Sequence, residues 1–175
     1  MGPANHQQAL ALAPLPFGAE SHRLGPFRLE GAWQVTSRNA DFGGYSAMLA
    51  VSGDGFLALS DGGQYLRYPR PGASGPVEIG ALLATQGVLK HYRDVEAATR
   101  DPQTGAFWVA LEGRNAIIRL GPDRQEQAAR QIPEMQGWGS NTGPEAMVRL
   151  ADGRFLVLSE AFTGWSEAVR HPGLL

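Results

Sequence analysis

Two short apolar runs joined by a turn form a pattern that occurs three times in this chain of 175 residues. The copies cover residues 46–61, 96–112 and 145–160. They begin at positions 46, 96 and 145, so the spacings are 50 and 49 residues. The three turns contain Asp54-Gly55, Thr104-Gly105 and Asp152-Gly153. These residue types favour the positive φ of tight hairpin turns, and the flanking Val, Leu, Phe and Trp favour strands. The pattern predicts three β-hairpins.

Further strands are expected after the first two hairpins. Third strands are predicted at Gln64–Tyr68 and Ala116–Leu120, and weaker outer strands at Val77–Ile79 and Gln127–Ile132. Four antiparallel strands repeated every 40–50 residues or so are typical of a β-propeller blade. The sequence therefore predicts an all-β, β-propeller-like fold of about three four-stranded antiparallel blades. Ala32–Ser37 is predicted to be one more strand, the outer strand of a blade that is completed elsewhere.

Composition supports short elements over long helices, because the chain has 23 Gly and 12 Pro and these residues are the poorest helix formers. Three blades are too few to close a propeller, which needs roughly four to eight. We therefore expect either a fragment of a longer protein or a ring that other chains complete by self-association through the open edges. Residues 1–25 are expected to be an irregular lead-in, and residues 26–175 an incomplete propeller domain. The alternative fold is an open meander or a small sandwich.

Charge and cysteine content exclude several function classes. The formal net charge of −2 argues against a nucleic-acid-binding protein, which normally carries a strongly basic face. The absence of cysteine excludes disulfides, thiolate metal sites and cysteine nucleophiles. The sequence contains no run of about 18 apolar residues, so it predicts no membrane-spanning helix. The N-terminus carries no clear signal peptide.

Acidic residues recur at matching positions in the three hairpins. In an antiparallel hairpin, the start of the first strand lies opposite the end of the second strand. The expected facing pairs are Ser46 with Asp61, Glu96 with Glu112, and Glu145 with Glu160. If the blades are related by rotation about one axis, the six positions converge on one rim.

A rim that gathers five carboxylates favours a divalent cation, because like charges repel and hard oxygen ligands suit Ca²⁺ or Mg²⁺. The candidate metal ligands are Asp61, Glu96, Glu112, Glu145 and Glu160. The alternative is that these strand-end carboxylates simply face water. Four further residues near this rim are candidates for binding an anionic substrate: His91, Arg93, Arg114 and Asn115. One arginine side chain can donate two parallel hydrogen bonds to two oxygens of a phosphate group.

Several stretches of the chain resemble the phytase-like proteins described as having "esterase-like activity of phytase". The resemblance rests on Phe42-Gly-Gly-Tyr-Ser-Ala, Ala58-Leu-Ser-Asp-Gly-Gly63, Asp94-Val-Glu-Ala-Ala, Phe107-Trp-Val-Ala-Leu-Glu112, Glu145-Ala-Met and Leu158-Ser-Glu160. It covers about residues 31–165. It implies a β-propeller, a periplasmic or secreted location, and hydrolysis of phosphate or carboxylic esters.

The resulting functional hypothesis is a phytase-like or esterase-like hydrolase that uses a divalent cation, with Ca²⁺ as the candidate, bound by the rim carboxylates. Glu96, Glu112 and Arg93 are the candidate catalytic residues, and the substrate is expected to be a small anionic molecule or ester. Two alternatives remain open. One is a propeller that binds a ligand or a protein without turnover, and the other is a metal-dependent hydrolase similar to sugar lactonases.

Overall fold

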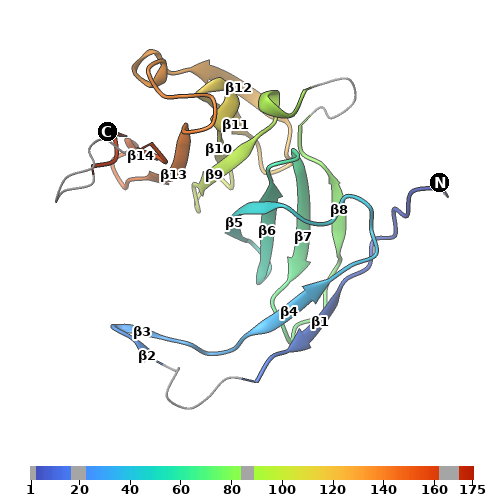
Figure 1. Cartoon of the computed structure of the whole chain (residues 1–175). Helices are drawn as coiled ribbons and strands as arrows, with labels where there is room; N and C mark the ends of the chain where they lie inside the picture. Colours follow the sequence, from blue (N-terminus) through green and yellow to red (C-terminus); the bar gives the residue numbers. More distant parts are fainter. Residues whose placement is uncertain (1–2, 17–22, 84–88, 162–169) are drawn as a thin grey trace.

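The structure is a computed structural model that describes residues 3–16, 23–83, 89–161 and 170–175. Figure 1 shows three successive β-sheets arranged around a common centre, with an N-terminal pair of strands beside the first sheet. The all-β, propeller-like fold predicted from the repeats is confirmed. No helix in the described part of the chain combines the length and the apolar character needed to span a bilayer.

The three sheets correspond to the three sequence repeats, and we call them the first, second and third blades. The first blade contains β5 (Tyr45–Val51), β6 (Gly55–Ser60), β7 (Gln64–Pro69) and β8 (Glu78–Ala81). The second contains β9 (Val95–Arg100), β10 (Phe107–Leu111), β11 (Ala116–Leu120) and β12 (Glu126–Gln131). The third contains β13 (Pro144–Arg149), β14 (Phe155–Ser159) and β15 (Gly173–Leu174). In each blade, neighbouring strands are consecutive in the chain and antiparallel.

The predicted strands and turns agree closely with these elements. The strand predicted at Ala116–Leu120 is β11 without change, whereas the predicted outer strands differ by one or two residues from β8 and β12 at either end. The positive φ angles of the second and third turns fall on Gly105 and Gly153, at 76° and 90°. In the first turn, positive φ falls on Gly53 and Asp54 instead of Gly55, because Gly55 already belongs to β6.

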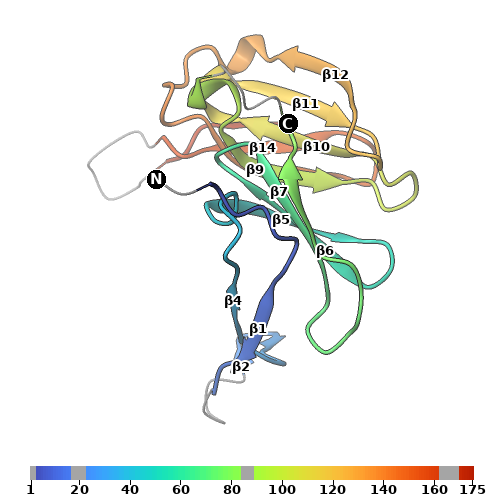
Figure 2. The same ribbon diagram turned by 90° about the vertical axis from the view of Figure 1, so that its right-hand side faces the viewer.

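The N-terminal region differs from its prediction. Within the segment expected to be irregular, β1 (Ala11–Pro14) pairs antiparallel with β4 (Trp33–Thr36). Between them lies a small hairpin of β2 (Arg23–Leu24) and β3 (Phe27–Arg28). Residues 1–2 and 17–22 of the predicted lead-in lie outside the described residues. The strand expected at Ala32–Ser37 is therefore present as β4, with β1 as its partner. Figure 2 shows β1 and β4 side by side, extending away from the first blade.

Apolar side chains fill both spaces between neighbouring blades. Between the first and second blades, one buried cluster includes Leu59, Val95 and Leu111, none of which is exposed to solvent. Between the second and third blades, a second cluster includes Ala110 and Met147. The inner strands β5, β9 and β13 contact one another in that order. This packing brings the starts of the three inner strands together.

Candidate metal and catalytic site

Each inner strand contains a β-bulge at the same repeat position. The pairing register shifts between Tyr45 and Ala47 in the first blade, and between Pro144 and Ala146 in the third. In the second blade, the partners of β10 skip from Ala97 to Val95. The skipped residues are Ser46, Glu96 and Glu145, the three predicted rim positions. A bulge redirects a side chain and ends regular pairing, and bulges are common beside functional sites.

The partner carboxylates also occupy equivalent positions. The backbone N–H groups of Asp61, Glu112 and Glu160 donate to the carbonyl oxygens of Gly44, Asp94 and Gly143, each at 2.9–3.0 Å. Each acidic residue thus lies just beyond the end of the second hairpin strand, beside the bulge of its own blade. The predicted facing pairs are therefore close in all three blades, although the bulge displaces them from direct cross-strand register.

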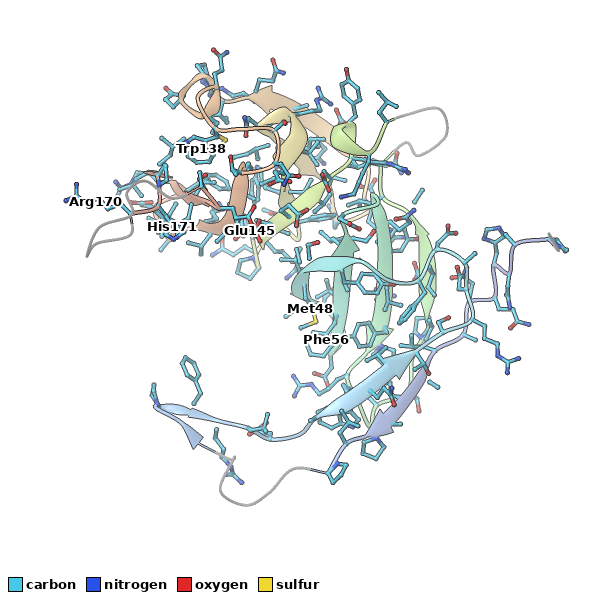
Figure 3. All side chains as sticks on the ribbon, in the orientation of Figure 1. Met48, Phe56, Trp138, Glu145, Arg170 and His171 are labelled. Carbon is cyan, nitrogen blue, oxygen red and sulfur yellow. The ribbon has the colours of Figure 1, made fainter. Side chains whose placement is uncertain are left out.

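Two groups of three carboxylates form where the blades meet. Asp94, Glu96 and Glu112 bring one oxygen each within 4.8 Å of one another, and Glu112, Glu145 and Glu160 do the same. Glu112 belongs to both groups and is buried, whereas Glu145 and Glu160 are exposed. We call the five residues of the two groups the acidic cluster. In Figure 3, Glu145 lies near the start of β13, on the side of the third blade that faces the other two blades.

Burial and repulsion between carboxylates raise the pKa of three glutamates in this cluster. The pKa of Glu96 is raised to about 7, chiefly by burial and also by the charges of Asp94, Glu145 and Glu112, while a hydrogen bond from Ser46 opposes the rise. Burial also raises the pKa of Glu112, while a hydrogen bond from the Gly143 N–H lowers it. Partial desolvation by neighbouring atoms and the charge of Glu160 raise the pKa of Glu145, although its side chain is exposed. Near pH 7, Glu96 therefore retains a proton for much of the time, whereas an isolated glutamate would have released it.

Lys90, in the 3₁₀ helix η2 (Lys90–Tyr92), provides a positive charge beside the cluster. Its Nζ lies 2.9 Å from Oδ1 of Asp94 and 3.2 Å from Oδ2 of Asp61. Its hydrogen bond to Asp94, together with that to Asp61, raises the pKa of Lys90. Asp61, a predicted metal ligand, lies outside both carboxylate groups and pairs with this ammonium instead.

Sequence reasoning did not single out Asp94 or Lys90 as functional residues. Asp94 is the repeat equivalent of Gly44 in the first blade and of Gly143 in the third. The second blade alone therefore has a carboxylate at this position. Its side chain is 9% exposed. Lys90 is the only lysine in the chain, which could have drawn attention to it.

Three of the four predicted substrate-binding residues have described side chains, and each of the three has different neighbours. Arg93 packs along the turn after β6, near Gly63, and its buried Nε has no hydrogen-bond partner among the described residues. Arg114, in η3 (Glu112–Arg114), lies over the Tyr92 ring at 5.6 Å. The Nδ2 of Asn115 donates to the Trp138 carbonyl at 2.9 Å, linking this turn to the segment after η4 (Pro133–Met135). The side chain of His91 lies outside the described part of the structure.

A sizeable pocket lies beside the predicted substrate-binding residue Arg114. It has a volume of about 810 Å³ between the first and second blades, and its lining includes Tyr65, Leu82, Arg114 and Arg124. Arg124 is already engaged there, with its guanidinium 4.4 Å from the Tyr65 ring centre and 3.1 Å from Glu78. No residue of the acidic cluster lines this pocket.

Comparisons with known proteins identify a family and several structural likenesses. The family profile described as "Phytase-like: Esterase-like activity of phytase" matches residues 40–168. No curated protein matches the chain. Similar solved structures include the Pan2 WD40 domain of Neurospora crassa, at 11% identity and TM-score 0.43, covering 66% of this chain and 29% of that one. Hydrazine synthase of Kuenenia stuttgartiensis has the same identity and TM-score, with 66% and 28% covered.

A protein of Bacteroides fragilis is similar over more of the chain. It has 12% identity and a TM-score of 0.49, and the match covers 93% of this chain and 39% of that protein. In all three cases the match spans less than half of the length of the other protein.

Proposed function

The chain belongs to the phytase-like family of proteins with esterase-like activity, and from this premise we propose that its acidic cluster binds a divalent cation for hydrolysis of phosphate or carboxylic esters. The observation that carries this proposal is the position of Glu112, which is buried and shared by two groups of three carboxylates. Burying a carboxylate beside other carboxylates is unfavourable unless protons or cations neutralise the charge.

The donor set fits Ca²⁺ in chemistry and in spacing. All the ligands are carboxylate oxygens, which hard cations prefer, and Ca²⁺–oxygen distances are about 2.3–2.6 Å. Two oxygens on opposite sides of one Ca²⁺ are therefore about 4.6–5.2 Å apart. Two ligands of one ion cannot be farther apart than this, and the oxygens of each group meet that limit because they all lie within 4.8 Å of one another. Glu112, Glu145 and Glu160 are the ligands we favour, because Asp94 in the other group already pairs with Lys90.

We assign the remaining candidate residues to two roles, proton transfer and substrate binding. A bound divalent cation would lower the pKa of a water ligand and stabilise negative charge that develops on the substrate. Glu96, with its pKa raised to about 7, suits proton transfer near neutral pH. Arg93 is adjacent in sequence to Asp94, and we assign it to the anionic group of the substrate. The alternative role for Glu96 and Glu112 is direct cation binding.

A binding protein without turnover is the second candidate function, and the Lys90 contacts favour it. The Lys90 ammonium pairs with Asp61 and Asp94 and so neutralises part of the acidic charge without any metal ion. In that case the cluster would stabilise the contact between blades, and ligand binding would take place elsewhere on the propeller.

The test combines calcium titration with hydrolysis assays on the purified chain. Calorimetry measures Ca²⁺ binding to chelator-treated wild type, Glu145→Gln and Glu160→Gln, with Glu134→Gln as an exposed control outside the cluster. The substrates are 4-nitrophenyl phosphate, 4-nitrophenyl acetate and a simple sugar lactone. Calcium-dependent hydrolysis that is lost in Glu96→Gln supports the proposal, and the preferred substrate separates ester hydrolases from lactonases. Calcium binding without turnover favours the binding protein, and an absence of calcium binding rejects the metal site.

A further inference from the structure

Two apolar sheet faces at opposite ends of the three blades are exposed. On the third blade, Val148, Leu156 and Leu158 are 46%, 36% and 41% exposed. Val148 and Leu156 are cross-strand partners, so these side chains form one continuous face. On the first blade, Met48 is 60% exposed, its sulfur accepts a hydrogen bond from the Tyr68 hydroxyl at 3.5 Å, and Phe56 packs against the Tyr68 ring. Figure 3 shows Met48 and Phe56 on the side of the first blade that faces β4.

For each exposed face, the repeat-equivalent residues of another blade are buried against a neighbouring blade. Leu49, Leu57 and Leu59 of the first blade are the repeat equivalents of Val148, Leu156 and Leu158. They are at most 7% exposed, because they pack against Phe107 and Val109 of the second blade. The exposed face of the third blade thus has the composition of a face that another blade covers.

The exposed face of the first blade corresponds to the other side of the contact between two blades. Met48 and Phe56 are the repeat equivalents of Met147 and Phe155 in the third blade. Met147 is 9% exposed and belongs to the same buried cluster as Ala110 of the second blade. Ala110 in turn is the repeat equivalent of Leu158. The same type of contact therefore joins the first blade to the second and the second blade to the third. One side of such a contact is left exposed on the third blade, and the complementary side is left exposed on the first blade.

We propose that the Val148–Leu156–Leu158 face binds the Met48–Phe56 face of a second copy of this chain, head to tail. The occupant is a second copy because this chain carries both complementary halves of a contact that it already forms twice. A groove of about 400 Å³ beside Met48 and Tyr68, bordered also by Val35 of β4, has space for the incoming aliphatic side chains. The outer part of the same face is already covered by Leu10 and Phe42, so the free part is the part near the inner strand.

Such a contact would extend the row of acidic residues. At the contact between the second and third blades, the earlier blade contributes Glu112 and the later blade contributes Glu145 and Glu160. The equivalent residues at the proposed contact are Glu160 of one copy and Ser46 and Asp61 of the other. The proposal itself does not depend on the hydrolase function, because it rests on apolar packing.

A charge-pair experiment tests the proposed contact. Met48→Lys places a cation on one face and Leu158→Glu places an anion on the other. Each variant alone buries an unpaired charge at every contact, so we expect self-association to weaken about tenfold or more. In an equimolar mixture, one contact joins the introduced ammonium to the introduced carboxylate and the other is wild type, so association should return. Phe27→Glu, on the exposed hairpin of β2 and β3, is the control and should associate as wild type does.

Sedimentation velocity over a range of concentrations gives the size of each species relative to the 18.7 kDa monomer. Circular dichroism confirms that each variant is folded, which is expected because Met48 and Leu158 are both exposed. A wild type that stays monomeric at high concentration overturns the proposal, and would mean that other protein segments cover these faces. Association that survives both single variants, or a mixture that stays monomeric, also overturns it.

Discussion

The backbone N–H of Gly143 donates a hydrogen bond to Oε1 of Glu112 across the contact between the second and third blades, with a nitrogen–oxygen distance of 3.3 Å. Glu112 is the carboxylate shared by both groups of the acidic cluster. The residue just before the third blade therefore orients the central acidic side chain of the second blade. The geometry of the cluster consequently depends on how closely these two blades approach.

Replacing Gly143 by alanine should separate the blades at this point. A methyl group at Gly143 would lie 2.8 Å from the Glu112 carbonyl oxygen and 2.9 Å from Oδ1 of Asn115. Both neighbours are fixed, so we expect the free energy of unfolding to fall by about 1–3 kcal/mol, as in other overpacked sites. Urea denaturation measures the change. Gly137→Ala is the matched control, because a methyl group there has no neighbour within 4 Å. Equal stability of the two variants would contradict the close contact.

Calcium should stabilise the folded chain through the exposed carboxylates of the cluster. If Ca²⁺ binds only the folded state, a concentration one hundred times the dissociation constant adds about 2.7 kcal/mol to the free energy of unfolding. Glu145→Gln should reduce this gain, because it removes a charged ligand and keeps a similar shape. Thermal unfolding with Ca²⁺ and with chelator measures the gain, with Glu126→Gln on exposed β12 as control. An unchanged melting temperature in chelator would mean that the wild type binds no calcium in the cluster.

Stability without a divalent cation should fall as the pH rises through neutrality. The pKa of Glu96 is raised from 4.5 to about 7, so the folded state binds more protons than the unfolded state in this interval. The stabilising contribution is complete below about pH 4.5 and is lost as the pH rises through about 7. The pKa values of Glu112 and Glu145 are raised too, so their contributions have the same sign.

The check is urea denaturation in chelator at about pH 5 and about pH 8. The wild type should have the lower denaturation midpoint at the higher pH, and Glu96→Gln should show a smaller difference because its amide does not ionise. A wild type that is as stable at the higher pH as at the lower would show that these glutamates ionise normally.

Lys90 should contribute more to stability than other ion-paired residues of the chain. Lys90→Met would leave the carboxylate of Asp94, which is 9% exposed, without its cation. We expect a loss of about 1–2 kcal/mol, below the full cost of breaking a buried pair because the Lys90 side chain is itself 58% exposed.

The control for Lys90 is the pair of Arg70 and Asp54, whose side chains are 61% and 59% exposed. Arg70→Met should cost about 0–1 kcal/mol, as surface ion pairs do. Adding Asp94→Asn to Lys90→Met should recover part of the loss in a double-mutant cycle. If the Lys90 and Arg70 variants lose the same amount, the burial of Asp94 has no energetic consequence.

The hairpins, their turns and the sheet order could be predicted from the sequence because they depend on local patterns. The strand Ala116–Leu120 and the positive φ of Gly105 and Gly153 follow from residue types within a few positions of each other. The repeat spacing also predicted which acidic residues occupy equivalent positions, since equivalent positions need only the order of residues along the chain.

Only the tertiary structure decided which of those acidic residues meet. The distance between Glu112 and Glu145 depends on how the second and third blades pack, and the bulges at Glu96 and Glu145 redirect both side chains. The pairing of Asp61 with Lys90 joins two blades through a short helix whose direction no periodic pattern specifies. The pKa of Glu96 likewise depends on packing, because burial and the charge of Glu145 in the third blade both raise it. Charge and burial act through space, so residues far apart in sequence determine them.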